Sequence, residues 1–268
     1  IYWKRPEYPV RLAAGMNGRI MNCAPGGARL ANKVFPVPRL IPRRGNPREP
    51  LAAGIGRGKF YMKVQKMYNG KMPTALISVF NKEGIVPFAR TLIELNWRII
   101  SSGGTARTLR EAGLPVTDVA EISGLRAVLG HRVVTLVPHI HGGLLATENQ
   151  REELNELGYP WIDLCCVDFY PLQDAIADPR ATEESIIEKT DIGGPTMVRS
   201  AAKGRRIVIV DPRDRIPVLE WIKSGQPDSD KFKRKLAAKA EGIVADYCLQ
   251  AAKFHSDGEI SGSVIFPS

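Results

Sequence analysis

From residue 74 onward, short apolar runs alternate with segments of helical periodicity, and this alternation restricts the possible folds more than any other feature. The apolar runs lie at residues 75–80, 97–101, 116–119, 161–167 and 206–210. The helical segments lie at residues 85–95, around Leu109, and at 122–129, 181–189, 196–202 and about 230–254, and a further helix is expected to start at Asp211 and Pro212. Strands that are apolar on both faces need cover on both sides. The pattern therefore predicts a three-layer α/β fold of the Rossmann/flavodoxin type, with a mainly parallel sheet and additional C-terminal helices.

The segment from Ser101 to Ala106, which reads Ser-Ser-Gly-Gly-Thr-Ala, joins an apolar run to a helix. Parallel sheets bind ligands beyond the C-terminal ends of their strands. Glycines let backbone N–H groups approach an anion, a helix start adds partial positive charge, and the hydroxyls of Ser102 and Thr105 can donate hydrogen bonds. A glycine-rich turn without a ligand is the simpler interpretation, but the position after a strand favours an anion site.

A second glycine pair lies in residues 191–196, which read Asp-Ile-Gly-Gly-Pro-Thr and precede another helical segment. Arg199 and Lys203 follow at i and i+4, so their side chains share one helix face. Asp191 and Lys203 are candidates for an acid/base pair whose pKa values are tuned by burial. From these residues alone, a surface ion pair at a helix end is the simpler interpretation.

Residues 1–73 differ sharply from the rest and are called the basic leader below. They contain nine prolines and nine glycines and carry a net charge of +13, whereas the remaining 195 residues carry −3. Without an apolar period, the leader is predicted to be mostly disordered. A flexible tail, a nucleic-acid or organelle-targeting arm, and a mis-assigned start before Met62 or Met72 remain open, and composition favours the tail or the mis-assigned start. The predicted domains are thus 1–73 as leader, 74–255 as globular domain and 256–268 as C-terminal tail.

Several classes of protein are disfavoured. No run approaches 18 apolar residues and residues 1–9 do not resemble a secretory signal, so we expect a cytoplasmic protein without a membrane partner. The four cysteines, at positions 23, 165, 166 and 248, have no CxxC or Cys/His spacing and are predicted to be buried reduced thiols. His131, His139 and His141 gather in one predicted loop without a carboxylate at a useful spacing, so neither a metal nor a cofactor is predicted.

Five segments resemble, in order and spacing, the IMP cyclohydrolase domain of bifunctional purine-biosynthesis enzymes, which is a methylglyoxal-synthase-like domain. They start at Leu76, Ser102, His131, Phe169 and Asp191, and read LISVFNKEG, SGGTA, HRVVTLVP followed by HG at 141–142, FYP, and DIGGPTMVRSAAK. The last segment is long and specific. The resemblance runs from about Thr74 to Tyr247, and neither the formyl-transferring domain of those enzymes nor the basic leader takes part in it.

The resemblance implies that the domain closes the ribotide FAICAR to IMP with loss of water, as a homodimer and without a cofactor. It implies a phosphate cradle made of Lys82, Ser102, Gly103, Gly104 and Thr105, with help from Arg132 and Thr135. Tyr170, Asp191 and Lys203 are expected around the base and the reacting groups, with Lys203 as a proton donor or acceptor. Asn81, Asp168 and Ile192 are expected to complete the substrate pocket.

Five positions depart from the family pattern. Phe80 and Asn81 replace the usual Ser and Asp before Lys82, and Asp168 replaces an Asn. Val134 stands where a lysine is expected to stabilise developing negative charge, and Val137 stands where a histidine is usual. Because the loss of one preorganised donor commonly costs about 100- to 1000-fold in rate, the pattern predicts ligand binding more firmly than turnover. One hypothesis is that His139 or His141 substitutes for the missing groups.

Two further functions compete with the cyclohydrolase hypothesis. Val134 and Val137 motivate a non-catalytic nucleotide sensor, as in the regulatory domain of carbamoyl-phosphate synthetase. Nucleic-acid binding is the weaker alternative and would use the basic leader. Methylglyoxal synthesis is disfavoured because the segment at residues 191–203 indicates the purine branch. The purine hypothesis requires the turn at 102–105 and the segment at 191–203 to lie at the same end of the sheet.

Overall fold

The computed structural model describes residues 72–260, apart from 126, 130–132 and 258. The basic leader, apart from residues 72 and 73, lies outside the described residues, as do Cys23, His131 and Arg132, so the predictions made for them are not tested. In the described part of the chain, no helix is long and apolar enough to cross a lipid bilayer.

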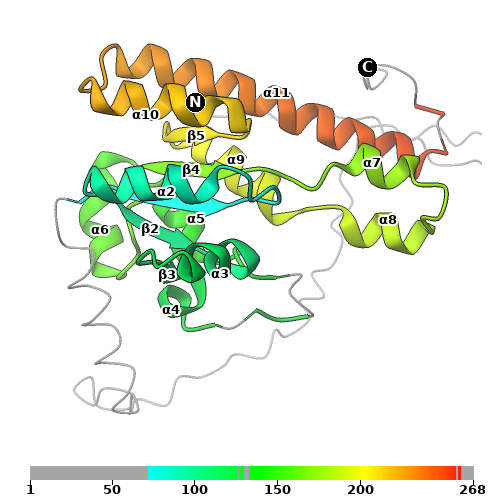
Figure 1. The fold of residues 1–268 in the computed structure, drawn as a ribbon, viewed down its shortest axis with the longest axis horizontal. Helices are drawn as coiled ribbons and strands as arrows, with labels where there is room; N and C mark the ends of the chain where they lie inside the picture. The colour runs from blue at the N-terminus through cyan, green and yellow to red at the C-terminus, as the bar shows by residue number, and fades with distance from the viewer. Residues whose placement is uncertain (1–71, 126, 130–132, 258, 261–268) are drawn as a thin grey trace, which may run out of the picture. The chain divides into compact units, whose positions relative to one another are not determined.

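A five-stranded parallel sheet forms the centre of the described domain, with the strand order β3-β2-β1-β4-β5 (Figure 1). The strands are β1 (Thr74–Ser78), β2 (Arg98–Ser101), β3 (Thr117–Asp118), β4 (Leu164–Val167) and β5 (Ile207–Ile209). In the register of the central strands, Ile77 of β1 lies beside Ser101 of β2 and Cys166 of β4. The predicted α/β class with a parallel sheet is therefore confirmed, and the C-terminal ends of β1, β2 and β4 meet at one edge.

Helices cover both faces of this sheet. They are α2 (Ile85–Glu94), α3 (Gly103–Glu111), α4 (Val119–Ser123), α5 (Pro138–Leu145), α6 (Arg151–Glu156), α7 (Leu172–Ala177), α8 (Glu183–Lys189), α9 (Gly193–Lys203), α10 (Arg215–Lys223) and α11 (Ser229–His255). On one face α2 packs against α3 and α10, and on the other α9 packs against α5, β4 and β5. The chain moves outward from β1 to β3 and then returns past β1 to β4. Right-handed crossovers in opposite directions place their helices on opposite faces.

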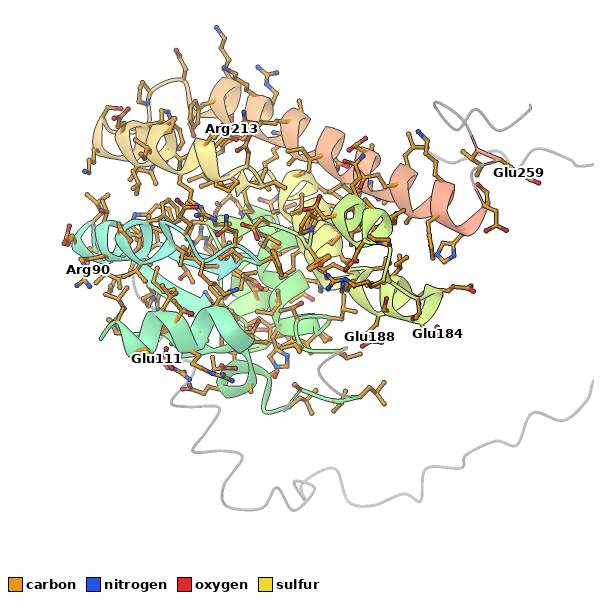
Figure 2. All side chains as sticks on the ribbon, turned by 45° about the vertical axis from the view of Figure 1, so that its right-hand side comes forward. Arg90, Glu111, Glu184, Glu188, Arg213 and Glu259 are labelled. Atoms are coloured by element: carbon orange, nitrogen blue, oxygen red, sulfur yellow. The ribbon has the colours of Figure 1, made fainter. Side chains whose placement is uncertain are left out.

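The core is built from the apolar runs that predicted the strands. Leu76, Ile77, Ile100 and Leu164 are fully buried, while charged side chains on the helices, such as Arg90 of α2, point outward (Figure 2). Cys165 and Cys166 are buried free thiols as predicted, and burial raises the pKa of the Cys166 thiol to about 12. The same prediction is wrong for Cys248, which is exposed on α11.

The helix predicted at 122–129 is wrong in its position. α4 ends at Ser123, because the following Gly124 has a φ of +67°, and it begins directly after Asp118. Asp118 accepts a hydrogen bond from the Ala120 N–H at 2.9 Å and forms a capping box with Glu121. This N-cap chemistry fixes the helix start three residues earlier than the apolar spacing suggested.

Three helices were not expected: α5, α6 and α7. His139 and His141 lie on α5 and not in a loop, so that prediction is wrong. Pro138 occupies the first helical position, where its missing N–H costs nothing. The paired glycines at 142 and 143 hide the helical pattern in the sequence. The strand predicted at 161–167 is shorter in the structure, because only the residues from Leu164 onward pair with neighbouring strands.

The long helix α11 has two packing partners along its length. Its first half packs on α9 and β5 through Leu236, Ala240 and Val244. Its second half packs on α7, and Tyr247 joins a separate apolar cluster that contains Leu172, Ala175 and Ile186. Helices α7 and α8 therefore lie beside the end of α11 and beyond the edge of the sheet (Figure 1).

Candidate functional site

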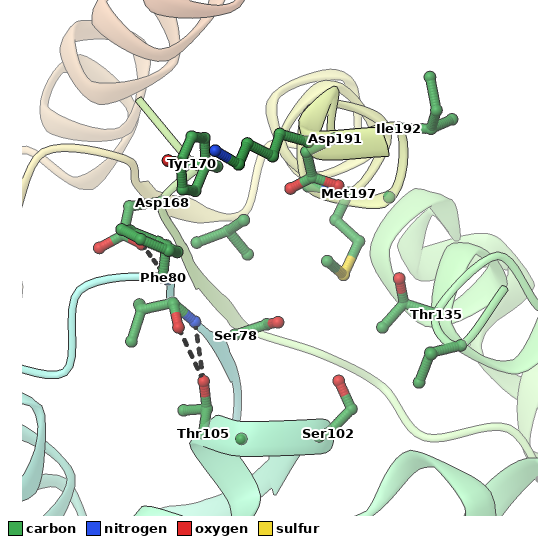
Figure 3. Close-up of a pocket in the computed structure, with 18 of the residues that line it drawn as sticks. Ser78, Phe80, Ser102, Thr105, Thr135, Asp168, Tyr170, Asp191, Ile192 and Met197 are labelled. Carbon is green, nitrogen blue, oxygen red and sulfur yellow. Dashed lines mark hydrogen bonds between the residues drawn. The ribbon is translucent and has the colours of Figure 1, made fainter. Parts of the chain in front are cut away.

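A pocket of about 890 Å³ lies at the edge where the C-terminal ends of β1, β2 and β4 meet. It is lined by residues from the ends of β1 and β4, from the start of α3, from residues 134–136 and from the α8–α9 region at 187–194. Ser102 and Thr105 lie on one side of the pocket, and Tyr170 and Asp191 lie on the other (Figure 3). We call these the α3 side and the α8–α9 side.

The α3 side is built around the N-terminus of α3. Thr105 is buried, and its hydroxyl donates to the Val79 carbonyl at 3.0 Å and accepts from the Val79 N–H at 3.1 Å, which ties the helix to the end of β1. Gly103 has a φ of +55°, which favours glycine. The first N–H groups of a helix have no partners within it and attract anions. The start of α3 can therefore bind an anion through its backbone.

The two hydroxyls of the Ser-Gly-Gly-Thr turn have different roles. The Thr105 hydroxyl gives its hydrogen to Val79, so the expectation that it donates to a ligand is wrong. Ser102 is the N-cap of α3, its side chain caps no N–H, and it lines the pocket. Its hydroxyl is available to a ligand.

Lys82 places a positive charge on the α3 side. Its Nζ donates to the carbonyls of Val79 and of Phe80, the latter at 3.0 Å, and its Cε lies 3.8 Å from where a Cβ on Gly104 would be. Burial lowers the pKa of Lys82, and the charge of Asp168 partly offsets this. Asn81, which was expected in the pocket, is not a lining residue. Its Oδ1 accepts from the Glu83 N–H at 2.9 Å, so it shapes the turn instead.

Asp168 lines the pocket and also organises the loop after β1. Its Oδ1 accepts from the N–H groups of Phe80 and of Asn81, the latter at 3.2 Å, and its Oδ2 accepts from Arg215 Nη2 at 3.2 Å. Arg215 also donates to the Glu83 carbonyl at 2.7 Å. Burial raises the pKa of Asp168, and these hydrogen bonds and the Arg215 charge oppose the rise. The replacement of the family's Asn is therefore accompanied by a buried ion pair.

Asp191 is held at the start of α9 on the α8–α9 side. Its Oδ1 accepts from the Gly194 N–H at 3.1 Å, and its own N–H donates to the Tyr247 hydroxyl at 2.7 Å. Burial raises the pKa of Asp191, and hydrogen bonds from the backbone of Gly194 and Gly193 oppose the rise. A Cβ on Gly194 would lie 2.7 Å from Phe169 Cδ1, so this position requires glycine.

Tyr170 and two exposed apolar side chains complete this side. The Tyr170 ring meets the Phe80 ring edge to face, with 4.7 Å between centroids, and Lys189 Nζ lies 5.2 Å from the Tyr170 centroid. Phe80 is 51% exposed and Ile192 is 61% exposed, and both line the pocket. Such apolar and aromatic walls suit a flat ring.

Val134 and Val137, which stand where the family has a lysine and a histidine, lie in different environments. Val134 lines the pocket and brings no charge to it. Val137 belongs to the core and does not line the pocket. Thr135 lines it and is buried, and its Oγ1 lies 3.0 Å from where a Cβ on Gly193 would be.

Lys203 does not reach the pocket within this chain, contrary to expectation. It is the last residue of α9 and is exposed, whereas Asp191 precedes the first. Eleven helical residues span about 15 Å at a rise of roughly 1.5 Å each. Asp191 and Lys203 therefore lie at opposite ends of α9, although they belong to one motif.

His139 and His141 do not line the pocket either, so neither takes the place of the missing groups there. The His139 ring packs on Tyr159 with 4.3 Å between centroids, and His141 Nδ1 lies 2.9 Å from Ser200 Oγ. Burial lowers the pKa of both histidines. In the part of the chain that the structure describes, no three His, Cys, Asp or Glu side chains are grouped so that they could hold a metal ion.

Six polar lining residues were missed from the sequence: Ser78, Arg107, Glu188, Lys189, Thr190 and His255. Arg107 lies in the second turn of α3, and Lys189 lies two residues before Asp191. Closeness to the two glycine motifs was a usable signal for both. His255 ends α11, and nothing in the sequence connects it with this pocket.

Comparisons with known proteins agree on the kind of domain. Residues 84–196 match the family described as MGS-like domain. The chain is 46% identical over 188 residues to the bifunctional purine biosynthesis protein PurH of Halalkalibacterium halodurans, which covers 68% of this chain and 37% of that protein. It is also 46% identical over 195 residues to PurH of Pediococcus pentosaceus, which covers 70% of this chain and 38% of that protein. The chain thus spans little more than a third of the length of these relatives.

One similar solved structure is described as "Crystal structure of ForH". It superposes with a TM-score of 0.61 at 34% sequence identity, and the match covers 70% of this chain and 100% of that chain.

Proposed function

The chain belongs to the MGS-like domain family, in the group that includes PurH, and we propose that it is an IMP cyclohydrolase that closes the purine ring of FAICAR. The observation that carries the proposal is the pocket itself. The turn at 102–105 and the segment that begins at Asp191 line the same cavity, as the purine hypothesis requires. A cavity of about 890 Å³ is large enough for a ribotide.

The α3 side supports binding of the phosphate. Free N–H groups at a helix start and the Ser102 hydroxyl are donors for phosphate oxygens, and Lys82 adds a positive charge. The base then extends towards Tyr170, Ile192 and Phe80. The ligand is therefore oriented by its phosphate at one end and by apolar contacts at the other.

The reaction is an intramolecular condensation. The carboxamide nitrogen of FAICAR attacks the formyl carbon, a C–N bond forms, and the carbonyl electron pair moves to the formyl oxygen. The C–O bond then breaks. Water leaves with that oxygen, one hydrogen from the carboxamide nitrogen and one from the formamido nitrogen. The protein has to hold the two groups together, stabilise the oxyanion and move protons.

Asp191 is the group that we assign to proton transfer from the carboxamide nitrogen. Its Oδ1 accepts from the Gly194 N–H, and because each carboxylate oxygen has two lone pairs, the group keeps acceptor capacity for a substrate proton. Burial raises the pKa of Asp191 towards the range in which a carboxylate is an efficient base. Tyr170 lies on the same side of the pocket as Asp191 and can orient the purine base of the ligand.

Incubation of the purified protein with FAICAR, followed by the absorbance of IMP, tests the proposal. We expect a rate well above the uncatalysed one, and we expect Asp191→Asn to remove most of it. A folded protein without such a rate would contradict the proposal. Calorimetric binding of IMP in that case would indicate a non-catalytic nucleotide-binding domain.

A further inference from the structure

The positive charges of the pocket are distributed unevenly. Among the described lining residues, three side chains are lysine or arginine: Lys82, Arg107 and Lys189. Lys82 and Arg107 lie on the α3 side, where the proposed function places the phosphate. Lys189 is the one of these three that lies on the α8–α9 side, where the proposed function places the reacting groups. Val134, at the position of the family's expected lysine, adds no charge.

Lys189 is held at the pocket wall by the packing of its helix. Thr182 caps the start of α8 by accepting from the Ser185 N–H at 3.2 Å. Ile186, one turn before the helix end, is buried in the cluster with Leu172, Ala175 and Tyr247. The last residue of α8 is Lys189, and it is half-buried. Its backbone position is therefore fixed by the same apolar cluster that anchors the end of α11.

The Lys189 ammonium group is available to a ligand. Among the described residues, Lys189 Nζ lies 5.2 Å from the centroid of the Tyr170 ring, and its charge also acts on the exposed carboxylate of Asp178, with which it forms no salt bridge. A cation near an aromatic face keeps its hydrogen-bond donors. Tyr170 thus orients the ammonium group without neutralising it.

We propose that Lys189 is a catalytic residue that donates a hydrogen bond to the formyl oxygen while negative charge develops there. This inference rests on the proposed function and extends it to a residue outside the matched motifs. The Lys189 charge supplies the stabilisation that the uncharged Val134 of the same pocket cannot supply. No proton leaves Lys189 in this step, because its contribution is the electrostatic stabilisation of the oxyanion.

The test compares three variants of the full chain. Lys189→Met removes the charge and keeps the apolar stem, and Lys189→Arg keeps a charge. Lys223→Met is the matched control, because Lys223 is also the last residue of its helix, α10, and lies outside the pocket. Both Met variants lose the same interaction with a helix C-terminus, so equal Tm values would show that Lys189 has no separate structural role.

With FAICAR, we expect Lys189→Met to lower kcat by about 100- to 1000-fold with little change in KM. Lys189→Arg should recover part of the loss, and Lys223→Met should behave as the wild type. If the wild type is active and Lys189→Met keeps a kcat within about threefold of it, the inference is overturned while the proposed function stands.

A binding measurement separates the other outcomes. We expect Lys189→Met to weaken IMP binding in calorimetry, at most about tenfold, and to leave ribose 5-phosphate binding unchanged, because Lys189 lies on the side of the base. If the wild type binds IMP without turnover and Lys189→Met weakens only IMP, then the proposed function fails and Lys189 is retained as a base-recognising cation but not as a catalytic residue. If the wild type has no turnover and both ligands bind equally well to wild type and variant, or neither ligand binds, the inference is overturned.

Discussion

The two sides of the pocket present different kinds of chemical groups. The α3 side offers backbone N–H groups and one free hydroxyl, and the buried bonds between Thr105 and Val79 fix it to the central sheet. The α8–α9 side offers the side chains of Tyr170, Lys189 and Asp191, on elements that pack against the end of α11. Under the proposed function, binding of the phosphate would therefore depend on backbone shape, whereas ring closure would depend on individual side chains.

This difference bears on the departures from the family pattern. A change of side chain at Phe80, Val134 or Asp168 leaves the backbone of the 102–105 turn intact. Under the proposed function, a substitution on the α8–α9 side changes a group close to the reacting atoms. The substitutions below separate the two sides, and the largest effects are expected on the α8–α9 side.

Replacement of Asp191 by Asn should have the largest effect on turnover. We expect kcat for FAICAR to fall by about 100- to 10,000-fold, the range for loss of a general base, with little change in IMP affinity. Burial raises the pKa of Asp191, so wild-type activity should fall as the pH decreases through a value above the ordinary one of about 3.9. The variant should lack this acid limb. An identical pH profile in both proteins would exclude Asp191 as the base.

Replacement of Arg215 by Met should have the largest effect on stability. It leaves the Asp168 carboxylate buried and unpaired beneath the loop after β1, which costs about 3–5 kcal/mol in the free energy of unfolding. Urea denaturation measures this loss. The double variant with Asp168→Asn should recover part of it, because the two residues interact directly. A loss below about 1 kcal/mol in the single variant would show that the ion pair does not organise this loop.

Replacement of Ser102 by Ala should affect binding alone. Loss of one hydrogen bond to a charged ligand costs about 1.5–3 kcal/mol, so IMP and ribose 5-phosphate should both bind about 10- to 100-fold more weakly. We expect kcat at saturating FAICAR to be unchanged, since this bond is equal in the ground and transition states. Ser224→Ala, at the end of α10, is the control. A fall in kcat would show that Ser102 also contributes to catalysis, and would contradict the division of binding and catalysis between the two sides.

Replacement of Gly194 by Ala should have the smallest effect of these on stability. The new Cβ would overlap with Asp191 Oδ2 and lie 2.7 Å from Phe169 Cδ1, and overpacking of this kind costs about 1–3 kcal/mol. Gly242→Ala on α11 is the matched control, because nothing lies within 4 Å of its Cβ. That variant should gain about 0.5–1 kcal/mol. Equal thermal shifts in the two variants would show that the start of α9 is not tightly packed.

The sheet and both glycine turns could be predicted because continuous apolar runs and strand-to-helix turns are local in the sequence. The 102–105 turn and Asp191 were therefore found correctly at one pocket. Lys203 was misplaced because a motif gives a spacing but not the direction in which a helix leaves the site.

Other features depend on contacts between distant residues. The role of Asp168 depends on Arg215, which is 47 residues away. The position of Lys189 depends on the packing of α8 against Tyr247, and no local sequence pattern indicates this packing. α5 escaped prediction because Gly142 and Gly143 interrupt its apolar spacing. Long-range packing therefore decides most of the α8–α9 side and little of the α3 side.

A crystal structure with bound IMP tests the central claim, that one ribotide spans both sides of this pocket. The account predicts phosphate oxygens at hydrogen-bond distance, about 2.7–3.2 Å, from the N–H groups of Gly103, Gly104 and Thr105. It also predicts the purine ring beside Tyr170 and Asp191. A phosphate bound away from the start of α3, or a base directed out of the pocket, would contradict it.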